Sequence, residues 1–436
     1  MRRIPVQEGQ ALIDVTPGIA FAVRERLAAL EVELAPKIPF LGSSGGSPVI
    51  QNLVGAVQIA PDLVLDVSPK TRETNDWAGS LLDLMTDERA HFGGETRKAV
   101  LTSRRSLPDA FARIYADQLG RAVRREGPLQ LMRHRHVSKA VLAGRLDVTR
   151  WVRERTTRPH RFPQMETVLT ADNEFTSAMA WVAEALAVRT SDHQTRGRLR
   201  TAAQALRPGL PHFTSVDPGI AFRPIPSQWR AYGPAWATTC AVLRKLSPLH
   251  RSGTQEGLNL AVEPWPLLET LLHRSLREAV RIGKERGLAL SMTPQSKHDF
   301  LAPNSTLPSV HPPHPLAAIH TTRRVEPDGS FWLNGEPLVT FEAKYSVPSY
   351  ARTRDHFFQA VTTAAAVGSS LSVLVYPGDY SPVVWENVGA SAAPVEVRAM
   401  GLNMYSYRRG TGDTERGLLL LDVAEEAINA RLTAAI

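Results

Sequence analysis

The sequence predicts a multidomain α+β protein, with a β-containing module first, a mostly helical region next, and a mixed sheet flanked by helices last. Three observations support this fold class. Short apolar runs separated by turn residues precede residue 70, apolar residues then recur at helical spacing, and helices alternate with short strands in the last part. A chain of 436 residues is long enough for two or three domains. We therefore expect domains at 1–75, 76–254 and 255–436.

The overall charge favours an anionic partner. The chain carries 51 Lys and Arg against 43 Asp and Glu, a formal net charge of +8, and this balance is typical of proteins that bind nucleic acid. The alternative is a basic surface with no particular partner. Cys240 is the only cysteine, which excludes intramolecular disulfides and cysteine-ligated zinc clusters and fits a reducing compartment.

The start of the chain does not resemble a secretion signal, because Met1-Arg2-Arg3 leads into a mixed segment instead of an apolar run. No uninterrupted apolar stretch of the sequence is long enough to cross a bilayer. We expect a cytoplasmic protein with no membrane partner.

The N-terminal module combines one helix with several strands. An apolar stripe predicts a helix over 19–31, and a Gly-Ser-rich run at 42–47 predicts a flexible loop. Runs of β-forming residues at 54–59 and 63–70, separated by Pro-Asp, predict a β-hairpin.

The middle region is mostly helical. Pro108 lies at the first turn of one expected helix, and Asp172-Asn173-Glu174 begins another. Between them, residues 129–137 predict a strand.

An arginine-dense segment follows this strand, and the aromatic residues Trp151 and Phe162 interrupt it. Basic and aromatic side chains interleaved in this way can follow a phosphate backbone. Arg145, Arg153 and Arg155 are therefore candidate DNA-binding residues. The alternative is a solvated helix face.

The last domain is expected to begin with an amphipathic helix that has Pro266 at a first helical position. Glu269 lies beside its apolar stripe, where a carboxylate must reach solvent or face a positive charge. After a proline-rich connection we expect a three-strand meander from Leu316 to Tyr345, with Asp-Gly and Asn-Gly turns. A helix closed by Gly368 and an apolar strand at 371–376 complete the mixed sheet.

The third strand of the meander carries Glu342 and Lys344, which lie two residues apart and share one side of the strand. A carboxylate there can bind a hard divalent cation, and an ammonium can orient the attacking water and offset charge on a phosphorane. The pattern therefore suits metal-assisted phosphodiester hydrolysis. The alternative is an ion pair on an edge strand. The order of helix, meander, helix and strand is the layout that lets Glu269 converge on this pair.

With these residues placed, the chain resembles the McrC family, the nuclease subunit of modification-dependent restriction systems. The similarity is carried by segments that follow the family's order. They are the hairpin from Val54-Gly55 to Ser68-Pro69-Lys70, the block Gly144-Arg145-Leu146-Asp147 with Asp172-Asn173-Glu174-Phe175, the helix start Trp265-Pro266-Leu267-Leu268-Glu269, the strand Phe341-Glu342-Ala343-Lys344-Tyr345, and Asp355 to Gln359 with the strand Val373-Leu374-Val375-Tyr376-Pro377.

The resemblance implies a PD-(D/E)xK-like nuclease domain at the C-terminal end, with Mg²⁺ or Mn²⁺ as cofactor and duplex DNA as substrate. Glu342 would bind the metal and Lys344 would polarise the nucleophile. Glu269 would orient water or contribute to metal binding, and Gln359 would orient Lys344 or the phosphate. The resemblance also implies a ring-forming McrB-type AAA+ GTPase, engaged by the N-terminal part. We expect a metal-dependent DNA endonuclease subunit in restriction and antiviral defence.

One position departs from the family's pattern. The family's first metal-binding acid follows a proline at the start of the meander, whereas Pro313-His314 occupies that place here. Three interpretations are open. His314 binds the metal, another acid (Asp299, Glu326 or Asp328) has taken over, or the site is inactive. In the last case the chain would be a McrC-like adaptor that stimulates the AAA+ motor and bridges it to DNA or to another effector.

Overall fold

The computed structural model describes most of the chain, in two compact units. One unit consists of Met1–Met85 together with Ala261–Ile436, and the other of Thr86–Leu260. The expected three-domain division stays a prediction. The described residues are 2–12, 15–34, 36–44, 47–60, 63–71, 77–85, 107–209, 216–245, 260–302, 322–348, 350–386, 395–408 and 411–434.

The N-terminal module is built on a four-stranded sheet with the strand order β1-β5-β4-β9. Strands β4 and β5 are antiparallel, which confirms the predicted hairpin, and β1 adds to β5 in parallel. The predicted first helix is also present, and its apolar stripe is buried. The elements are β1 (Arg2–Gln7), α1 (Pro17–Leu34), β4 (Val54–Ala60), β5 (Leu63–Ser68), α2 (Trp77–Met85) and β9 (Leu260–Val262).

The loop prediction for the Gly-Ser-rich run is wrong for residues 42–44 and 47, which lie in strands, and residues 45 and 46 lie outside the described part. Strands β2 (Leu41–Ser44) and β3 (Ser47–Ile50) pair antiparallel there, with Leu41 opposite Ile50. Ile50 and Phe40 are fully buried at the open end of this pair. Burial of these apolar side chains outweighs the low strand propensity of glycine and serine.

The C-terminal part contains a six-stranded mixed sheet with the order β10-β13-β14-β15-β17-β16. Strands β14, β15 and β17 are parallel, and the outer pairs are antiparallel. The predicted mixed sheet is therefore confirmed. The strands are β10 (Leu290–Pro294), β13 (Gly329–Leu333), β14 (Glu336–Ala343), β15 (Leu371–Tyr376), β16 (Val383–Glu386) and β17 (Glu396–Gly401).

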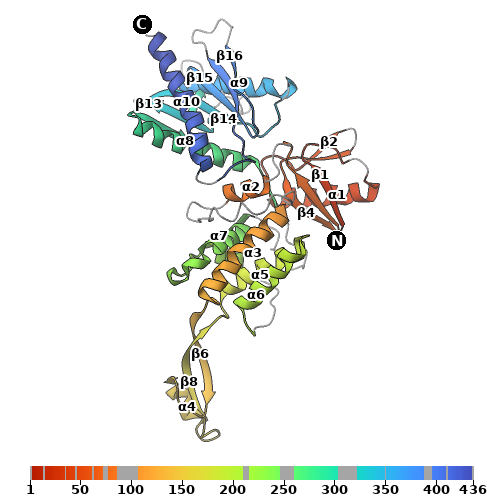
Figure 1. The fold of residues 1–436 in the computed structure, drawn as a ribbon, viewed down its shortest axis with the longest axis vertical. Coiled ribbons are helices and arrows are strands. Elements are labelled where there is room, and N and C mark those ends of the chain that lie inside the picture. Colours follow the sequence, from red (N-terminus) through yellow and green to blue (C-terminus); the bar gives the residue numbers. More distant parts are fainter. Residues whose placement is uncertain are drawn as a thin grey trace, which may run out of the picture. The chain divides into compact units, whose positions relative to one another are not determined.

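Helices cover both faces of this sheet (Figure 1). α9 (Tyr350–Val367) packs its small residues against Leu374 and Tyr376 of β15. α8 (Trp265–Glu285) lies on the opposite face together with α10 (Thr411–Ala434), where Leu276 of α8 meets Gly329 of β13. The predicted α8 and α9 are both present, and Gly368 closes α9 with a positive φ of 83°.

The predicted meander is only partly present. Its second and third strands are β13 and β14, but β12 (Arg323–Val325) pairs with β11 (His298–Leu301) in a separate sheet, and β10 takes its place beside β13. Pro327 has no N–H group for a strand ladder, so the chain stops pairing after β12. Residues 316–321 of the expected first strand lie outside the described part.

The second unit is a helical bundle that also carries a β-hairpin. Tyr115 is fully buried between the helices, where its hydroxyl donates to the backbone oxygen of Met179 and contacts Thr239 Oγ1 at 2.8 Å. The expected helix starts at Pro108 and near Asn173 are both present. The helical elements are α3 (Leu107–Glu126), α5 (Glu174–Arg189), α6 (His193–Leu206), η2 (Pro218–Phe222), η3 (Ser227–Tyr232) and α7 (Gly233–Lys245).

Strands β6 (Leu131–Lys139) and β8 (Phe162–Thr170) form this hairpin, which projects from the helices of its unit (Figure 1). The short β7 (Arg145–Leu146) pairs with β8, and α4 (Val148–Glu154) lies between them in the sequence. The predicted strand in this region is confirmed. We call β6, β7, β8 and α4, with their connections, the arginine hairpin.

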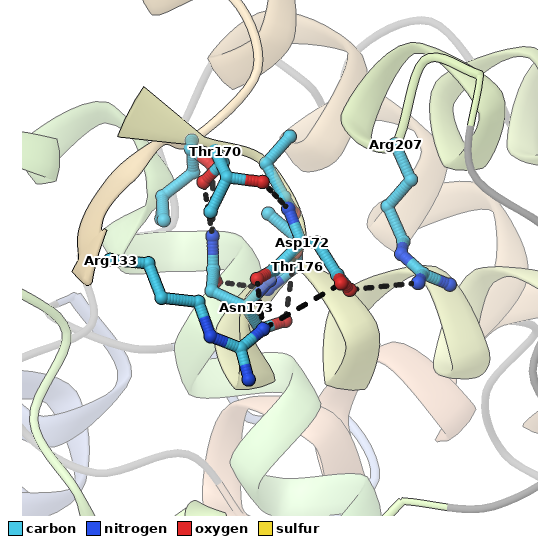
Figure 2. A network of polar contacts seen from close by, with 8 residues as sticks. Arg133, Thr170, Asp172, Asn173, Thr176 and Arg207 are labelled. Carbon is cyan, nitrogen blue, oxygen red and sulfur yellow. Dashed lines mark hydrogen bonds and ion pairs between the residues drawn. The ribbon is translucent and has the colours of Figure 1, made fainter. Parts of the chain in front are cut away.

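Polar contacts fix the root of the arginine hairpin to the helices (Figure 2). The Asp172 carboxylate lies 3.7 Å from Arg133 of β6 and 3.3 Å from Arg207, the C-cap of α6. Asn173 caps α5 by accepting from the Thr176 backbone N at 3.0 Å. The hairpin is therefore anchored at a defined position on its bundle.

In the part of the chain that the structure describes, no helix has the length and apolar character needed to span a bilayer.

Candidate functional site

Glu342 lies on β14 with its side chain turned toward α9, and the residue is only 1% exposed. Its Oε2 accepts from Lys344 Nζ at 2.9 Å and from Gln359 Nε2 at 2.7 Å, and its Oε1 accepts from Thr363 Oγ1 at 3.0 Å. Gln359 and Thr363 are four residues apart on α9 and share one helix face. Strand β14 and helix α9 therefore hold this buried carboxylate together.

Lys344 follows the end of β14 and bonds to two groups at once. Besides Glu342, its Nζ donates to Gln359 Oε1 at 2.8 Å. The Gln359 amide thus accepts from the lysine and donates to the glutamate, which fixes the orientation of both. The structure brings together the three residues that the sequence places on this strand and the following helix.

Asp328 immediately precedes β13 and joins the same site. Its Oδ2 accepts from the backbone N of Ala343 at 2.7 Å, next to Glu342 in β14. His273 of α8 contacts its backbone oxygen at 2.6 Å. Packing is tight at the following residue, because a Cβ at Gly329 would lie 2.4 Å from Cδ1 of the fully buried Leu276. The Ala343 backbone and the close packing of α8 against this turn therefore hold Asp328 in place.

Glu269 reaches the site from α8, one turn before His273. The side chain is half-buried, and Gln295 Nε2 donates to its Oε2 at 3.4 Å. We call Asp328, Glu342, Lys344, Glu269 and Gln359 the acid–lysine cluster. Its members come from two adjacent strands and from helices on both faces of the sheet.

Burial and mutual repulsion shift the carboxyl groups toward their protonated forms. Burial, followed by the charge of Asp328, raises the pKa of Glu269 to about 7. Burial also raises the pKa of Glu342 and that of Asp328, and the Lys344 ammonium opposes both shifts. Buried acids that raise one another's pKa are stabilised in their charged forms by a nearby cation.

Three acids were alternatives to His314 at the position of the family's first metal-binding acid, and of these the structure places Asp328 in the cluster. Asp299 instead pairs with Arg324 at 2.7 Å on the β11–β12 sheet, and Glu326 is exposed. His314 lies outside the described residues, so its proposed role as a metal ligand stays a prediction. A sequence signal for Asp328 was present: Pro327-Asp328 is itself a Pro-Asp pair, fourteen residues before Glu342.

The donor set fits a hard cation, since the cluster offers carboxylate oxygens and no sulfur. Glu342 Oε2 accepts two hydrogen bonds, from Lys344 and Gln359. Glu342 Oε1 accepts one, from Thr363, and retains a second acceptor position. Within the described residues, no three His, Cys, Asp or Glu side chains are grouped closely enough to hold an ion. The oxygens are present, but the arrangement is not a closed ligand shell.

The arginine hairpin lies in the other unit and presents exposed charge. Arg145 belongs to β7, Arg153 to α4, and Arg155 is the C-cap of that helix, and all three are exposed. Arg150 on the same helix pairs with Glu154 at 2.6 Å. A DNA-binding role for the three arginines stays a prediction.

The acid–lysine cluster combines groups that can accept a proton with one that can offset negative charge. Carboxylates at the ends of β13 and β14 can accept hydrogen bonds from water, and the ammonium between Glu342 and Gln359 can donate to a nucleophile or to a phosphate oxygen. The cluster can therefore hold a water molecule and stabilise negative charge beside it.

The comparisons with known proteins agree with this fold. A chain of the structure described as a refined half-complex from a tetradecameric assembly of Thermococcus gammatolerans McrB AAA+ hexamers with bound McrC aligns with a TM-score of 0.62 at 13% identity, over 96% of this chain and 100% of that chain. A chain of the Thermococcus gammatolerans McrBC complex aligns with a TM-score of 0.50 at 14% identity, over 64% of this chain and 88% of that chain. These likenesses show the fold.

No curated protein matches the chain. The family described as "McrBC 5-methylcytosine restriction system component" matches residues 49–377, well over half of the sequence. This match includes the arginine hairpin, the strand that carries Glu342, and Lys344 directly after it. The chain therefore belongs to the family of McrBC 5-methylcytosine restriction system components.

Proposed function

We propose that this chain is the McrC-like, DNA-cleaving subunit of a McrBC-type restriction system and that it hydrolyses phosphodiester bonds at the acid–lysine cluster. The observation that carries the proposal is that Asp328, just before β13, lies beside the stretch of β14 that holds Glu342, with Lys344 Nζ 2.9 Å from Glu342. Family membership supports it, because the matched segment contains the whole cluster.

Each residue of the cluster has a role that its contacts support. Asp328 and Glu342 would supply the oxygens that hold Mg²⁺ or Mn²⁺, and Glu269 of α8 lies near enough to interact with both carboxylates. When bound, such a cation polarises the phosphate and stabilises the charge that develops on it. Lys344, held by Gln359, orients the attacking water and donates to the phosphate oxygens.

The half-buried Glu269 is suited to proton transfer, because a group with a pKa of about 7 can accept a proton and release it near neutral pH. It lies beside Asp328, whose charge contributes to that pKa. We propose that Glu269 receives the proton from the attacking water or orients that water.

We further propose that the chain acts with a McrB-type AAA+ ring and that the N-terminal module docks on it. The similar chain from Thermococcus gammatolerans comes from an assembly of McrB AAA+ hexamers with bound McrC, and the alignment covers that chain completely. The exposed arginines of the arginine hairpin would bind the DNA backbone, since guanidinium groups form bidentate contacts with phosphate. Such a system would act in restriction and antiviral defence.

One observation favours a second function, an adaptor that stimulates the ring without cutting. Three protein groups already bind the Glu342 carboxylate, and the described residues contain no closed group of three metal ligands. A site satisfied by its own side chains can also be a structural ion pair.

Cleavage of a methylated plasmid by the chain together with its AAA+ partner, GTP and Mg²⁺ or Mn²⁺ separates the two functions. We expect linear product, and we expect Lys344→Ala to abolish it while assembly with the ring stays intact. Lys297→Ala serves as a control for loss of an exposed lysine. Unchanged cutting by Lys344→Ala would reject the site, and no cutting with either metal by the unaltered chain would favour the adaptor.

A further inference from the structure

A second lysine lies beside the acid–lysine cluster, and it comes from the N-terminal module. Lys37 lies in the connection between α1 and β2 and is exposed, with its Nζ 4.7 Å from the centroid of the Trp265 ring. Trp265 opens α8, and Glu269 follows four residues later. Residues four apart share one helix face. The Lys37 ammonium therefore lies on the side of α8 that presents Glu269.

The indole beneath Lys37 is held in a fixed orientation. Trp265 Nε1 donates to Glu263 Oε2 at 3.0 Å, and the same oxygen accepts from Asn52 Nδ2 at 3.4 Å. An ammonium over an aromatic face is stabilised by the ring quadrupole. Within the described part of the chain, the contact that Lys37 makes is with the Trp265 ring, and it forms no ion pair there. This lysine is therefore oriented, but its charge is not neutralised by an acid.

Buried polar contacts join the N-terminal module to the end of β14. Glu8, which is 1% exposed, accepts from the Asn52 backbone N at 2.7 Å and from the Tyr345 hydroxyl at 2.5 Å. Lys70 Nζ donates to the Tyr345 backbone oxygen at 2.9 Å and lies 3.7 Å from the centroid of its ring. Since Tyr345 directly follows Lys344, these contacts fix the module that carries Lys37 against the strand that carries the cluster.

The electrostatics agree with this placement. Glu269 and Asp328 both lie within electrostatic reach of the Lys37 ammonium. Charge interactions weaken with distance and are screened by salt beyond about 10 Å. The Lys37 ammonium is therefore a second positive charge near the acids that Lys344 also faces.

We propose that Lys37 is a substrate-binding residue of the cleavage site, where its ammonium contacts a backbone phosphate of the DNA strand beside the phosphodiester that is cut. This inference rests on the proposed function. Lys344 already bonds to Glu342 and Gln359, whereas Lys37 has no acid partner and can donate to a phosphate. Several clustered carboxylates repel a polyanion, and a cation at their edge offsets that repulsion.

The test combines cleavage rates with the salt dependence of DNA binding, using the whole chain with its AAA+ partner. In the Lys344→Ala background, which separates binding from cutting, adding Lys37→Ala should lower the slope of log affinity against log salt by about 0.9, the value for one lost phosphate contact on duplex DNA. With Lys344 intact, Lys37→Ala should cut about tenfold more slowly at low DNA concentration, and Lys37→Arg should cut nearly normally.

Lys284→Ala is the matched control. It removes the same charge from an exposed position on α8, about 22 Å along the helix from Glu269. Equal effects of Lys37→Ala and Lys284→Ala on slope and rate would overturn the inference. Failure of Lys344→Ala to stop cutting would instead reject the proposed function, whereas normal behaviour of Lys37→Ala beside an inactive Lys344→Ala would reject only the role of Lys37.

Discussion

The acid–lysine cluster and the arginine hairpin both contain many charged side chains, but these side chains differ in their exposure to solvent. In the cluster, Glu342 is 1% exposed and Lys344 is 12% exposed at the side chain, and each bonds to the other and to Gln359. In the hairpin, Arg153 and Arg155 are exposed. Glu342 and most of Lys344 are shielded from water, whereas the hairpin arginines face it.

This difference in burial suits the two regions to different functions. Buried charges interact strongly, shift one another's pKa and can act on a reacting group, because little solvent screens them. Exposed arginines interact weakly with their neighbours but can exchange counterions for phosphates along a DNA backbone. We therefore expect substitutions in the cluster to change the rate of cutting and substitutions in the hairpin to change the affinity for DNA.

The largest expected effect is that of Asp328→Asn. Loss of this carboxylate should slow DNA cleavage by about a thousandfold or more, because the site loses one of the acids that would hold the cation. Thermal unfolding supplies a second readout: Mn²⁺ or Mg²⁺ should raise the Tm of the unaltered chain and leave that of Asp328→Asn unchanged. Asp299→Asn, which removes an acid paired with Arg324 outside the cluster, is the control. Equal behaviour of the two variants would remove Asp328 from the site.

An intermediate effect is expected from the double substitution Arg153→Ala/Arg155→Ala. The affinity should fall for every DNA sequence. The slope of log affinity against log salt should decrease by about 1.8, as expected for the loss of two phosphate contacts. The cutting rate at saturating DNA should stay unchanged. Arg198→Ala/Arg223→Ala removes the same charge from arginines that pair with Asp117 and Glu174 in the same unit. If both double variants bind DNA equally well, the hairpin is only a solvated surface.

The smallest expected effect concerns stability and pH. Folding raises the pKa of Glu269 from 4.5 to about 7, so the folded chain binds a proton that the unfolded chain has released. This contribution to stability is complete below about pH 4.5 and is lost as the pH rises through about 7. With allowance for solvent screening of this half-buried group, the unaltered chain should lose about 1 kcal/mol more than Glu269→Gln across that range.

Chemical denaturation at several pH values measures this difference. Glu285→Gln, at the exposed end of the same helix, is the control and should follow the unaltered chain. A pH dependence of Glu269→Gln that matches the unaltered chain would show that Glu269 is not the group that titrates.

Much of the fold follows from local patterns. The apolar stripes of α1 and α8, the β4–β5 hairpin, the β14 and β15 strands and the Gly368 cap were all predicted, because each depends on residues close in the sequence. The predictions were wrong where contacts with residues distant in sequence determine whether and where a strand pairs. The Gly-Ser-rich run forms β2 and β3 because apolar residues at their open end become buried, and β12 leaves the meander because β10, from before the proline-rich connection, occupies its place.

The candidate site shows the same division. Glu342, Lys344 and Glu269 were predicted from residue type and spacing and Gln359 from the resemblance to the family, and the structure brings them to one place. Asp328 was only one of several alternative acids, although Pro327 precedes it. Its position is set by the Ala343 backbone and by packing of α8 against Gly329, and neither contact is local in sequence.

The sequence by itself determined which residues are chemically able to act, the order of helices and strands, and the family to which the chain is similar. The tertiary structure decided which acids meet, which charges are buried, and that Lys37 of the first module lies beside a helix from the last part of the chain. The reason is physical: side-chain chemistry and local periodicity are properties of short segments, whereas burial, pKa and convergence depend on contacts between segments hundreds of residues apart.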